Sequence, residues 1–217
     1  MVLQRRPLVI AIYDSKWFMR VLDIVKRRGV IFHHYYTPTD VPYGSVVYTD
    51  LEAVNRDLSH RGDVLVVYDP EKSCRSLEKA LLATMYITGF KSIIVGVDPG
   101  ESISYVFLGD EILLLYGIGG VGDLIRDVEY VLSCMPFREL RVKIGSGSNS
   151  SDVIHAIKAK YRDLHVEVVD EYSTTPSKNR LEEASYLYKK LRGLKPFRYR
   201  DIYAAYRIAL SKGVEVL

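Results

Sequence analysis

The chain has 217 residues, of which 48% are hydrophobic and 26% charged, and a formal net charge of +3 at pH 7. Such a chain can bury a full core as one large or two small domains, and its composition excludes a disordered protein. A charge of +3 is too small to indicate nucleic-acid binding by itself, so an electrostatic signal must come from local clusters.

The first 89 residues alternate predicted strands with predicted helices. Strands are expected at 7–13, 30–35, 45–48 and 63–68, and helices at 16–28 and about 74–88. In the first helix, apolar residues recur at helical spacing from Trp17 to Val25, and Gly29 ends the pattern. This alternation predicts that residues 1–89 form a small three-layer α/β domain with a mostly parallel sheet.

The pattern changes after Gly89. Three strands, at 92–98, 102–108 and 111–117, are separated only by short turns, as in an antiparallel meander. A helix at 121–134, a strand at 140–144, a helix at 151–161, a strand at 165–170 and helices near 177–191 and 201–211 follow. The order βββαβαβα, with one further helix, is the ribonuclease H-like topology. We therefore expect residues 90–217 to form a ribonuclease H-like α/β domain with a mixed sheet.

The location and the redox state of the protein follow from its apolar runs and its cysteines. The apolar run in PLVIAIY (7–13) is too short for a signal peptide or a membrane span, so we expect a cytoplasmic protein without a membrane partner. Cys74 and Cys134 lack the close spacing of a metal site, and two buried free thiols are expected, with a single disulfide as the alternative. One Gln and three Asn indicate a thermophilic source, because amides are thermolabile.

Three acidic motifs fall on the expected elements of the second domain. The first strand ends in VGVDPG (95–100), the strand at 165–170 runs into VVDEYSTT (168–175), and the last helix opens with RDIYAAYRIAL (200–210). In this order the motifs resemble those of the RuvC-type Holliday junction resolvases and their YqgF relatives. The resemblance covers residues 91–213 and leaves the first 90 or so residues unexplained.

The resemblance implies a catalytic, metal-binding triad of Asp98, Glu171 and Asp201. Hydrolysis of a phosphodiester by two metal ions needs carboxylates that converge where both ions reach the scissile phosphate. Mg²⁺ or Mn²⁺ is the expected cofactor, because these hard ions take oxygen ligands and retain waters. The implied enzyme is an endonuclease that acts on branched DNA or structured RNA, and two symmetric cuts in a junction favour a homodimer.

Each acid also has a structural interpretation, and the motifs depart from the family pattern. Asp98 before Pro-Gly is a common turn element, Glu171 can be a solvated strand end, and Asp201 can cap its helix. Tyr172 stands where the family has Arg, and Glu101 stands where YqgF relatives often have a basic or small residue. The alternative function is therefore a ribonuclease H-like module that binds nucleic acid or protein without cleaving it.

Two further segments are candidates for contact with nucleic acid. The loop in KIGSGSNSSD (143–152) offers Ser146, Ser148 and backbone N–H groups at a helix N-terminus to a phosphate, or it is only a polar loop with a helix cap. The segment YKKLRGLKPFRYR (188–200) interleaves aromatic residues with six basic ones that suit a nucleic-acid backbone. These basic residues are Lys189, Lys190, Arg192, Lys195, Arg198 and Arg200. The alternative is a charged interhelical loop.

Acids also follow strands in the first domain. Asp14, Asp50 and Asp69 each come after a strand-like segment, where carboxylates can bind a metal, as in phospho-receiver domains. No matching Lys or Ser/Thr pattern is evident in the sequence. We therefore expect these three acids to be turn or cap residues.

Overall fold

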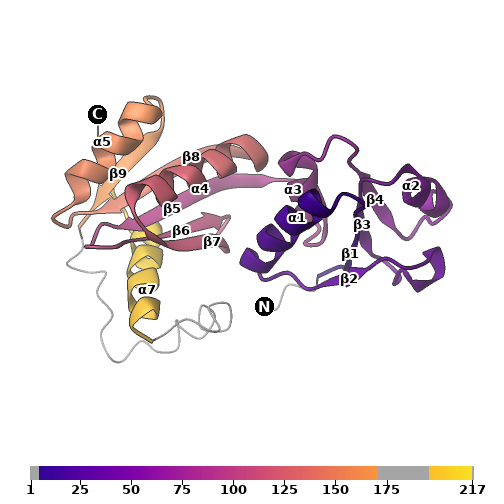
Figure 1. The fold of residues 1–217 in the computed structure, drawn as a ribbon. Coiled ribbons are helices and arrows are strands. Elements are labelled where there is room, and N and C mark those ends of the chain that lie inside the picture. Colours follow the sequence, from indigo (N-terminus) through magenta and orange to yellow (C-terminus); the bar gives the residue numbers. More distant parts are fainter. Residues whose placement is uncertain (1–4, 171–195, 217) are drawn as a thin grey trace. The chain divides into compact units, whose positions relative to one another are not determined.

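The computed structural model describes residues 5–170 and 196–216. The chain folds into two compact units (Figure 1). Unit 1 consists of the residues up to Phe90 together with Tyr130–Pro136, and unit 2 of Lys91–Glu129 and the residues from Phe137 onward. Both units are α/β, which confirms the predicted fold class. Within the described ranges, no helix is long and apolar enough to cross a membrane.

Unit 1 is built on a four-stranded parallel sheet. Its strand order is β2-β1-β3-β4. The strands are β1 (Leu8–Ala11), β2 (Phe32–His34), β3 (Val46–Thr49) and β4 (Leu65–Tyr68). The helices are α1 (Ser15–Arg27), α2 (Glu52–Leu58) and α3 (Cys74–Ala83), with a 3₁₀ turn, η1 (Pro38–Asp40). The parallel sheet was predicted.

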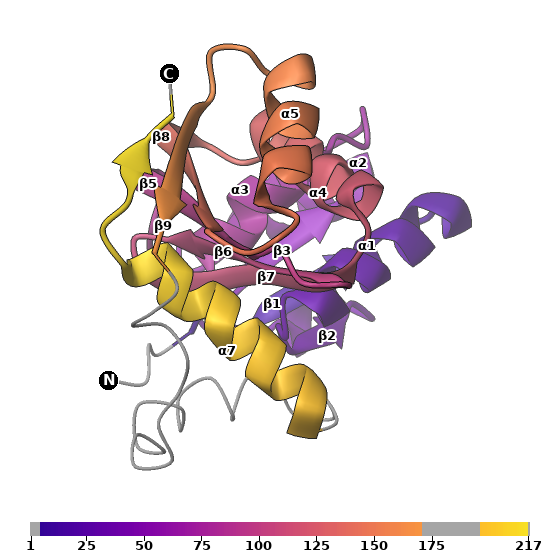
Figure 2. The ribbon, with the colours of Figure 1, turned by 90° about the vertical axis from the view of Figure 1, so that its left-hand side faces the viewer.

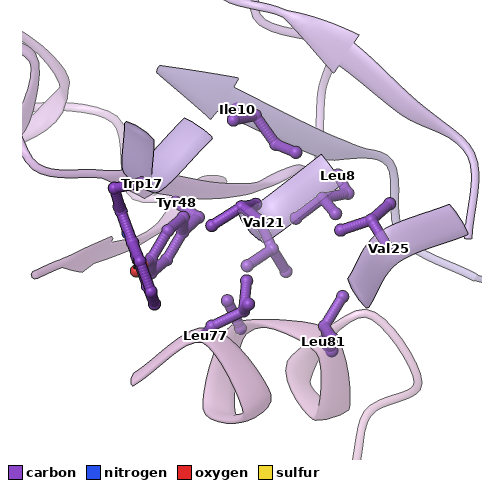
Figure 3. Packing of buried hydrophobic residues seen from close by; sticks show 10 residues of the cluster. Leu8, Ile10, Trp17, Val21, Val25, Tyr48, Leu77 and Leu81 are labelled. Carbon is purple, nitrogen blue, oxygen red and sulfur yellow. Dashed lines mark hydrogen bonds between the residues drawn. The ribbon is translucent and has the colours of Figure 1, made fainter. Parts of the chain in front are cut away.

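Alternate residues of β1 and β3 supply two cores, one on each face of this sheet. Leu8 and Ile10 pack with Trp17 and Val21 of α1 and with Leu77 of α3 (Figure 3). The residues between them, Val9 and Ala11, pack on the other face with Val54 and Leu58 of α2. This period of two is what a buried strand requires when helices cover both of its faces. Unit 1 is therefore a three-layer domain.

Helix α2 is not among the elements expected from the sequence. It has seven residues, and its buried residues are Val54 and Leu58, which lie one turn apart. Two apolar positions are too few for a periodic pattern, so the segment is difficult to distinguish from a loop by sequence.

Unit 2 contains a six-stranded mixed sheet of order β10-β9-β8-β5-β6-β7. The strands are β5 (Phe90–Asp98), β6 (Ile103–Gly109), β7 (Ile112–Gly119), β8 (Phe137–Gly145), β9 (His165–Val169) and β10 (Val214–Glu215). The first three form the predicted antiparallel meander, and β8 pairs in parallel with β9. This strand order is compatible with a ribonuclease H-like fold, as predicted. The two-residue β10 is an addition to the expected elements.

Helices cover both faces of the sheet of unit 2 (Figure 2). These helices are α4 (Val121–Cys134), α5 (Ser150–Lys160) and α7 (Pro196–Leu210). Tyr105 of β6 donates a hydrogen bond to buried Asp127 of α4, at 2.9 Å. Its chain neighbours Ser104 and Val106 point to the opposite face, where Val106 packs with α7. Helices α4 and α7 therefore lie on opposite faces.

Cys74 and Cys134 form a disulfide, which corrects the expectation of two free thiols. The two residues are 60 apart in the sequence, but their Cα atoms lie 5.3 Å apart, because Tyr130–Pro136 belongs to unit 1. Neighbouring hydrogen bonds fix this segment: Arg75 Nε donates to the Ser133 carbonyl at 2.7 Å, and Phe90 N donates to the Pro136 carbonyl at 3.0 Å. The sequence pattern did not show this return of the chain to unit 1.

A buried ion pair accompanies the disulfide. Glu78 is 0% exposed and accepts hydrogen bonds from Arg28 at 3.3 Å and from the Tyr130 hydroxyl at 2.7 Å. Burial, followed by the charge of Glu78, raises the pKa of Tyr130. Because the carboxylate of Glu78 has lost its hydration, it depends on these partners, and they hold Tyr130 against α3.

We predict that the disulfide makes a large contribution to the stability of unit 1. Closing a chain segment of 60 residues in the unfolded state is worth about 4 kcal/mol by chain entropy. Reduction, or the double substitution Cys74→Ser/Cys134→Ser, is expected to lower the free energy of unfolding by about that amount. Fluorescence of Trp17, the single Trp of the chain, reports unfolding of unit 1 in guanidinium.

The double variant is also the control, because its unfolding midpoint should not respond to reductant. An unchanged midpoint of the reduced wild-type protein would contradict the prediction, provided that a thiol assay shows complete reduction.

Candidate functional site

Asp98 is the last residue of β5 and is half-buried. It pairs with Ser104 of β6 in the antiparallel register, so the two side chains project from the same face of the sheet. Gly96 lies two residues earlier on β5 and shares that face with Asp98. An added Cβ atom at Gly96 would meet α7, so this is the face that α7 covers. Asp98 therefore stands at a strand end on the α7 side of the sheet.

Two hydrogen bonds join the loop that follows β8 to the turn after β5 and to the end of β9. The side-chain amide of Asn149 donates to the carbonyl oxygen of Gly100 at 3.1 Å. In the same loop, Ser146 N donates to the carbonyl oxygen of Val169, the last residue of β9, at 2.9 Å. The loop after β8 thus connects the end of β5 with the end of β9. The ends of these strands gather at one edge, where α/β sheets bind ligands.

Ser146 and Ser148 are exposed in this connecting loop. Asn149 is the N-cap residue of α5, but its side chain makes no capping hydrogen bond, because its amide is bound to Gly100. These contacts place the loop beside the turn that follows Asp98. The assignment of the two serines to phosphate binding stays a prediction.

Helix α7 approaches β5 closely at Gly96. An added Cβ at Gly96 would lie 2.7 Å from the Ala209 Cβ and still closer to the Ala205 carbonyl oxygen. Ala205 and Ala209 are both 0% exposed, and their small side chains permit this approach. Asp201 precedes Ala205 by one helical turn and is exposed, as is Arg200. The close contact therefore determines where the helix carries Asp201 relative to the sheet.

Ser104 is a residue of this site that sequence reasoning missed. It is 1% exposed, and within the described part of the chain its hydroxyl has no hydrogen-bond partner. The signal that could have found it is the register of the predicted meander, since a short connection after Asp98 brings the start of β6 opposite that residue.

The structure describes two of the three acids of the expected triad. Asp98 and Asp201 lie on β5 and on α7, the helix that covers the Asp98 face, whereas Glu171 lies outside the described residues. Asp170, the residue after β9, is exposed. In residues 5–170 and 196–216 no group of three or more His, Cys, Asp or Glu side chains could hold a metal ion. A metal site with three such ligands at Asp98 would thus need a ligand from outside these ranges.

Most of the expected basic cluster also lies outside the described part of the chain. This holds for Lys189, Lys190, Arg192 and Lys195. Arg198 is in α7, but its side chain is not described. Their contact with nucleic acid stays a prediction.

The acids of unit 1 are cap and turn residues, as expected. Asp14 caps α1 by accepting from Trp17 N at 2.9 Å, and its other oxygen accepts from Lys72 at 2.6 Å. The hydrogen bond from Lys72, followed by that from Trp17, lowers the pKa of Asp14 to about 2. Asp50 accepts from the backbone N–H groups of Tyr13 at 2.8 Å and of Asp14 at 3.3 Å.

Asp69 is the buried member of these three acids. It accepts from the Tyr48 hydroxyl at 2.5 Å and from Ser73 N at 2.8 Å, while Tyr48 in turn accepts from the Trp17 indole at 2.9 Å. Burial, followed by the hydrogen bond to Asp69, raises the pKa of Tyr48. These bonds fix α1 and α3 against the sheet.

Comparisons with known proteins give only distant structural similarity. No protein-family model and no curated protein matches the sequence. The structure is similar to that of Marinitoga piezophila Argonaute in complex with 5′ OH guide RNA, with a TM-score of 0.29 and 8% identity. The same Argonaute with guide RNA and target DNA gives a TM-score of 0.27 and 8% identity. The alignments cover 77% and 76% of this chain but only 40% and 39% of Argonaute.

We predict that Gly96→Ala displaces α7. The new methyl group would meet backbone atoms of Ala205 and Ala209, which a side-chain rotation cannot relieve, and we expect unit 2 to lose about 2–3 kcal/mol of stability. Hydrogen–deuterium exchange of peptides from α7 measures the effect directly, because a displaced helix loses protection.

The matched control is Gly62→Ala in unit 1. An added Cβ there has nothing within 4 Å, so exchange in α7 should not change. Unchanged protection of α7 in the Gly96→Ala variant would contradict the close contact.

Proposed function

We propose that unit 2 is a metal-dependent endonuclease related to the RuvC and YqgF families. The observation that carries the proposal is that the loop after β8 contacts both the turn after β5 and the end of β9, through the bonds Asn149–Gly100 and Ser146–Val169, next to the strand end that bears Asp98. This edge belongs to a sheet whose order is compatible with a ribonuclease H-like fold. A carboxylate at a rigid strand end can hold a cation with little loss of conformational freedom.

The proposed catalytic and metal-binding residues are Asp98, Glu171 and Asp201. The Asp98 carboxylate fits Mg²⁺ or Mn²⁺ in type, because its oxygens are hard ligands, and the Ser104 hydroxyl, which has no partner among the described residues, stands beside it on the sheet. When bound, such an ion lowers the pKa of a water nucleophile and neutralises charge on the phosphate. Asp98 and Asp201 would anchor the ion from the sheet and from α7, and Glu171 would complete the set.

The proposed substrate is nucleic acid, either branched DNA or structured RNA. Ser146 and Ser148 are exposed in the loop that binds the Asp98-Pro-Gly turn, and their hydroxyl groups would bind a phosphate. Arg200 is exposed one residue before Asp201 and would contact the backbone next to the site. The other basic residues of the segment 188–200 would extend this surface.

We further propose a cytoplasmic, homodimeric enzyme from a thermophile. A cytoplasmic enzyme of a thermophile is consistent with the scarcity of Gln and Asn, and the intracellular proteins of hyperthermophiles are a known exception in carrying disulfides such as Cys74–Cys134. Paired cuts in a branched substrate would need a homodimer with two-fold symmetry. Unit 1 would then serve substrate positioning or dimerisation.

A second candidate function is a module that binds nucleic acid or protein without cleavage. It is favoured by exposed Glu101, three residues after Asp98, which adds a negative charge that a phosphate must approach.

We predict that cleavage of a four-way DNA junction or a structured RNA in the presence of Mn²⁺ depends on Asp98. The isosteric change Asp98→Asn removes the charge that binds the ion and should lower the cleavage rate at least about 100-fold. The matched control is Asp163→Asn, the same change at an exposed position before β9, at the end of the strand remote from Val169. This control should cleave at the wild-type rate.

Equal cleavage by Asp98→Asn and wild type would exclude the proposed site. Binding of either substrate without any cleavage by the wild-type protein would instead support the second candidate function.

A further inference from the structure

Among the described residues, the hydroxyls of Ser104 and Tyr161 in unit 2 are buried side-chain groups without a hydrogen-bond partner, and Ser104 is the one that stands beside Asp98. The residue is 1% exposed, and within the described part of the chain its Oγ atom has no hydrogen-bond partner. A buried hydroxyl without a partner destabilises a fold by about 1–3 kcal/mol, and such groups in native proteins call for an explanation. A buried donor without a partner at a strand end can be explained by a hydrogen bond that forms only when a ligand is bound.

The position of Ser104 indicates which group accepts this hydrogen bond. The side chains of β6 that face α7 are Ser104, Val106 and Leu108. They pair, in this order, with Asp98, Gly96 and Ile94 of β5. Four of these six positions, Val106, Leu108, Gly96 and Ile94, are apolar, and Val106, Leu108 and Ile94 pack in the cluster with α7. Polar groups occur only in the pair at the strand end, where Ser104 stands opposite Asp98.

A need for a small side chain under α7 at position 104 would not explain why the residue is serine rather than alanine. Alanine would fill nearly the same volume and would avoid the cost of desolvating a hydroxyl. The residue opposite Ser104 on β7 is Ile118, which packs at the margin of the same apolar cluster. On this row the carboxylate of Asp98 is therefore the neighbouring side chain that can accept a hydrogen bond from the Ser104 hydroxyl.

We propose that Ser104 is a positioning residue for the cation site at Asp98. When a divalent ion is bound, the Ser104 hydroxyl donates a hydrogen bond to the Asp98 carboxylate and fixes the oxygen that faces the ion. Carboxylates that bind metals commonly have such a second partner, and its loss typically costs 10–100-fold in metal affinity. The inference rests on the proposed metal-dependent function of unit 2 and adds a residue to it.

The test uses the full-length protein and compares wild type with Ser104→Ala, Ser104→Thr and Ser102→Ala. Binding of Mn²⁺ is measured by calorimetry, and the thermal midpoint is measured in the presence of EDTA. Ser104→Ala should weaken Mn²⁺ binding at least about 10-fold. It should also raise the midpoint without metal, because it removes a buried donor that has no partner. These opposite effects on binding and stability distinguish a positioning role from a structural one.

The two other variants control for the position and for the hydroxyl. Ser102 is exposed two residues before Ser104, and Ser102→Ala should leave both quantities unchanged. Ser104→Thr keeps the hydroxyl and should bind Mn²⁺ more tightly than Ser104→Ala. Asp98→Asn identifies the part of the binding that belongs to this site.

Each contrary outcome has a distinct meaning. If wild type binds Mn²⁺ through Asp98 and Ser104→Ala binds it equally well, the role of Ser104 is wrong and the nuclease proposal stands. If Ser104→Ala lowers the thermal midpoint without metal, the hydroxyl supports the fold and the inference is also wrong. If Asp98→Asn removes no Mn²⁺ binding from the wild-type protein, the metal site and the inference fall together.

Discussion

The close contact between α7 and β5 at Gly96 is the constraint on which the candidate site depends. Because no Cβ is present at Gly96, the backbone of the helix at Ala205 and Ala209 can reach the sheet. Asp98 lies two residues further along the strand, and Asp201 lies one turn before Ala205 on the helix. A single contact between backbones thus fixes the two elements that carry the described acids. Of the six positions of β5 and β6 that face the helix, only Asp98 and Ser104, at the strand end, carry polar side chains.

Much of this arrangement could be predicted from the sequence, because it depends on local periodicity. The apolar runs and short turns predicted the meander, and the alternation of strands and helices predicted the strands that follow it. Asp98 could be assigned to a strand end for the same reason. The short β10 and α2 were missed because two residues of strand, or two apolar positions in a helix, produce no period that stands out from a loop.

The remaining features depend on where distant segments meet, and local patterns do not contain that information. The disulfide joins residues 60 apart, and only the return of Tyr130–Pro136 to unit 1 brings Cys74 and Cys134 together. Ser104 is similar, because a serine at the start of a strand has no distinctive sequence signal. It becomes notable only when the strand register and the burial show, beside Asp98, a hydroxyl with no hydrogen-bond partner among the described residues.

The contrast between the two units shows why an acid at a strand end does not by itself make a site. In unit 1 both oxygens of Asp14 and both of Asp50 accept hydrogen bonds, so a cation would have to displace Lys72 or backbone N–H groups that hold α1 in place. The carboxylates of Asp14 and Asp50 therefore stabilise the fold through these hydrogen bonds. In unit 2 the strand end of Asp98 has beside it a buried donor that the described chain leaves unsatisfied. A fold tolerates such a cost where a ligand later removes it, and the unsatisfied donor therefore supports the proposed site at the end of β5.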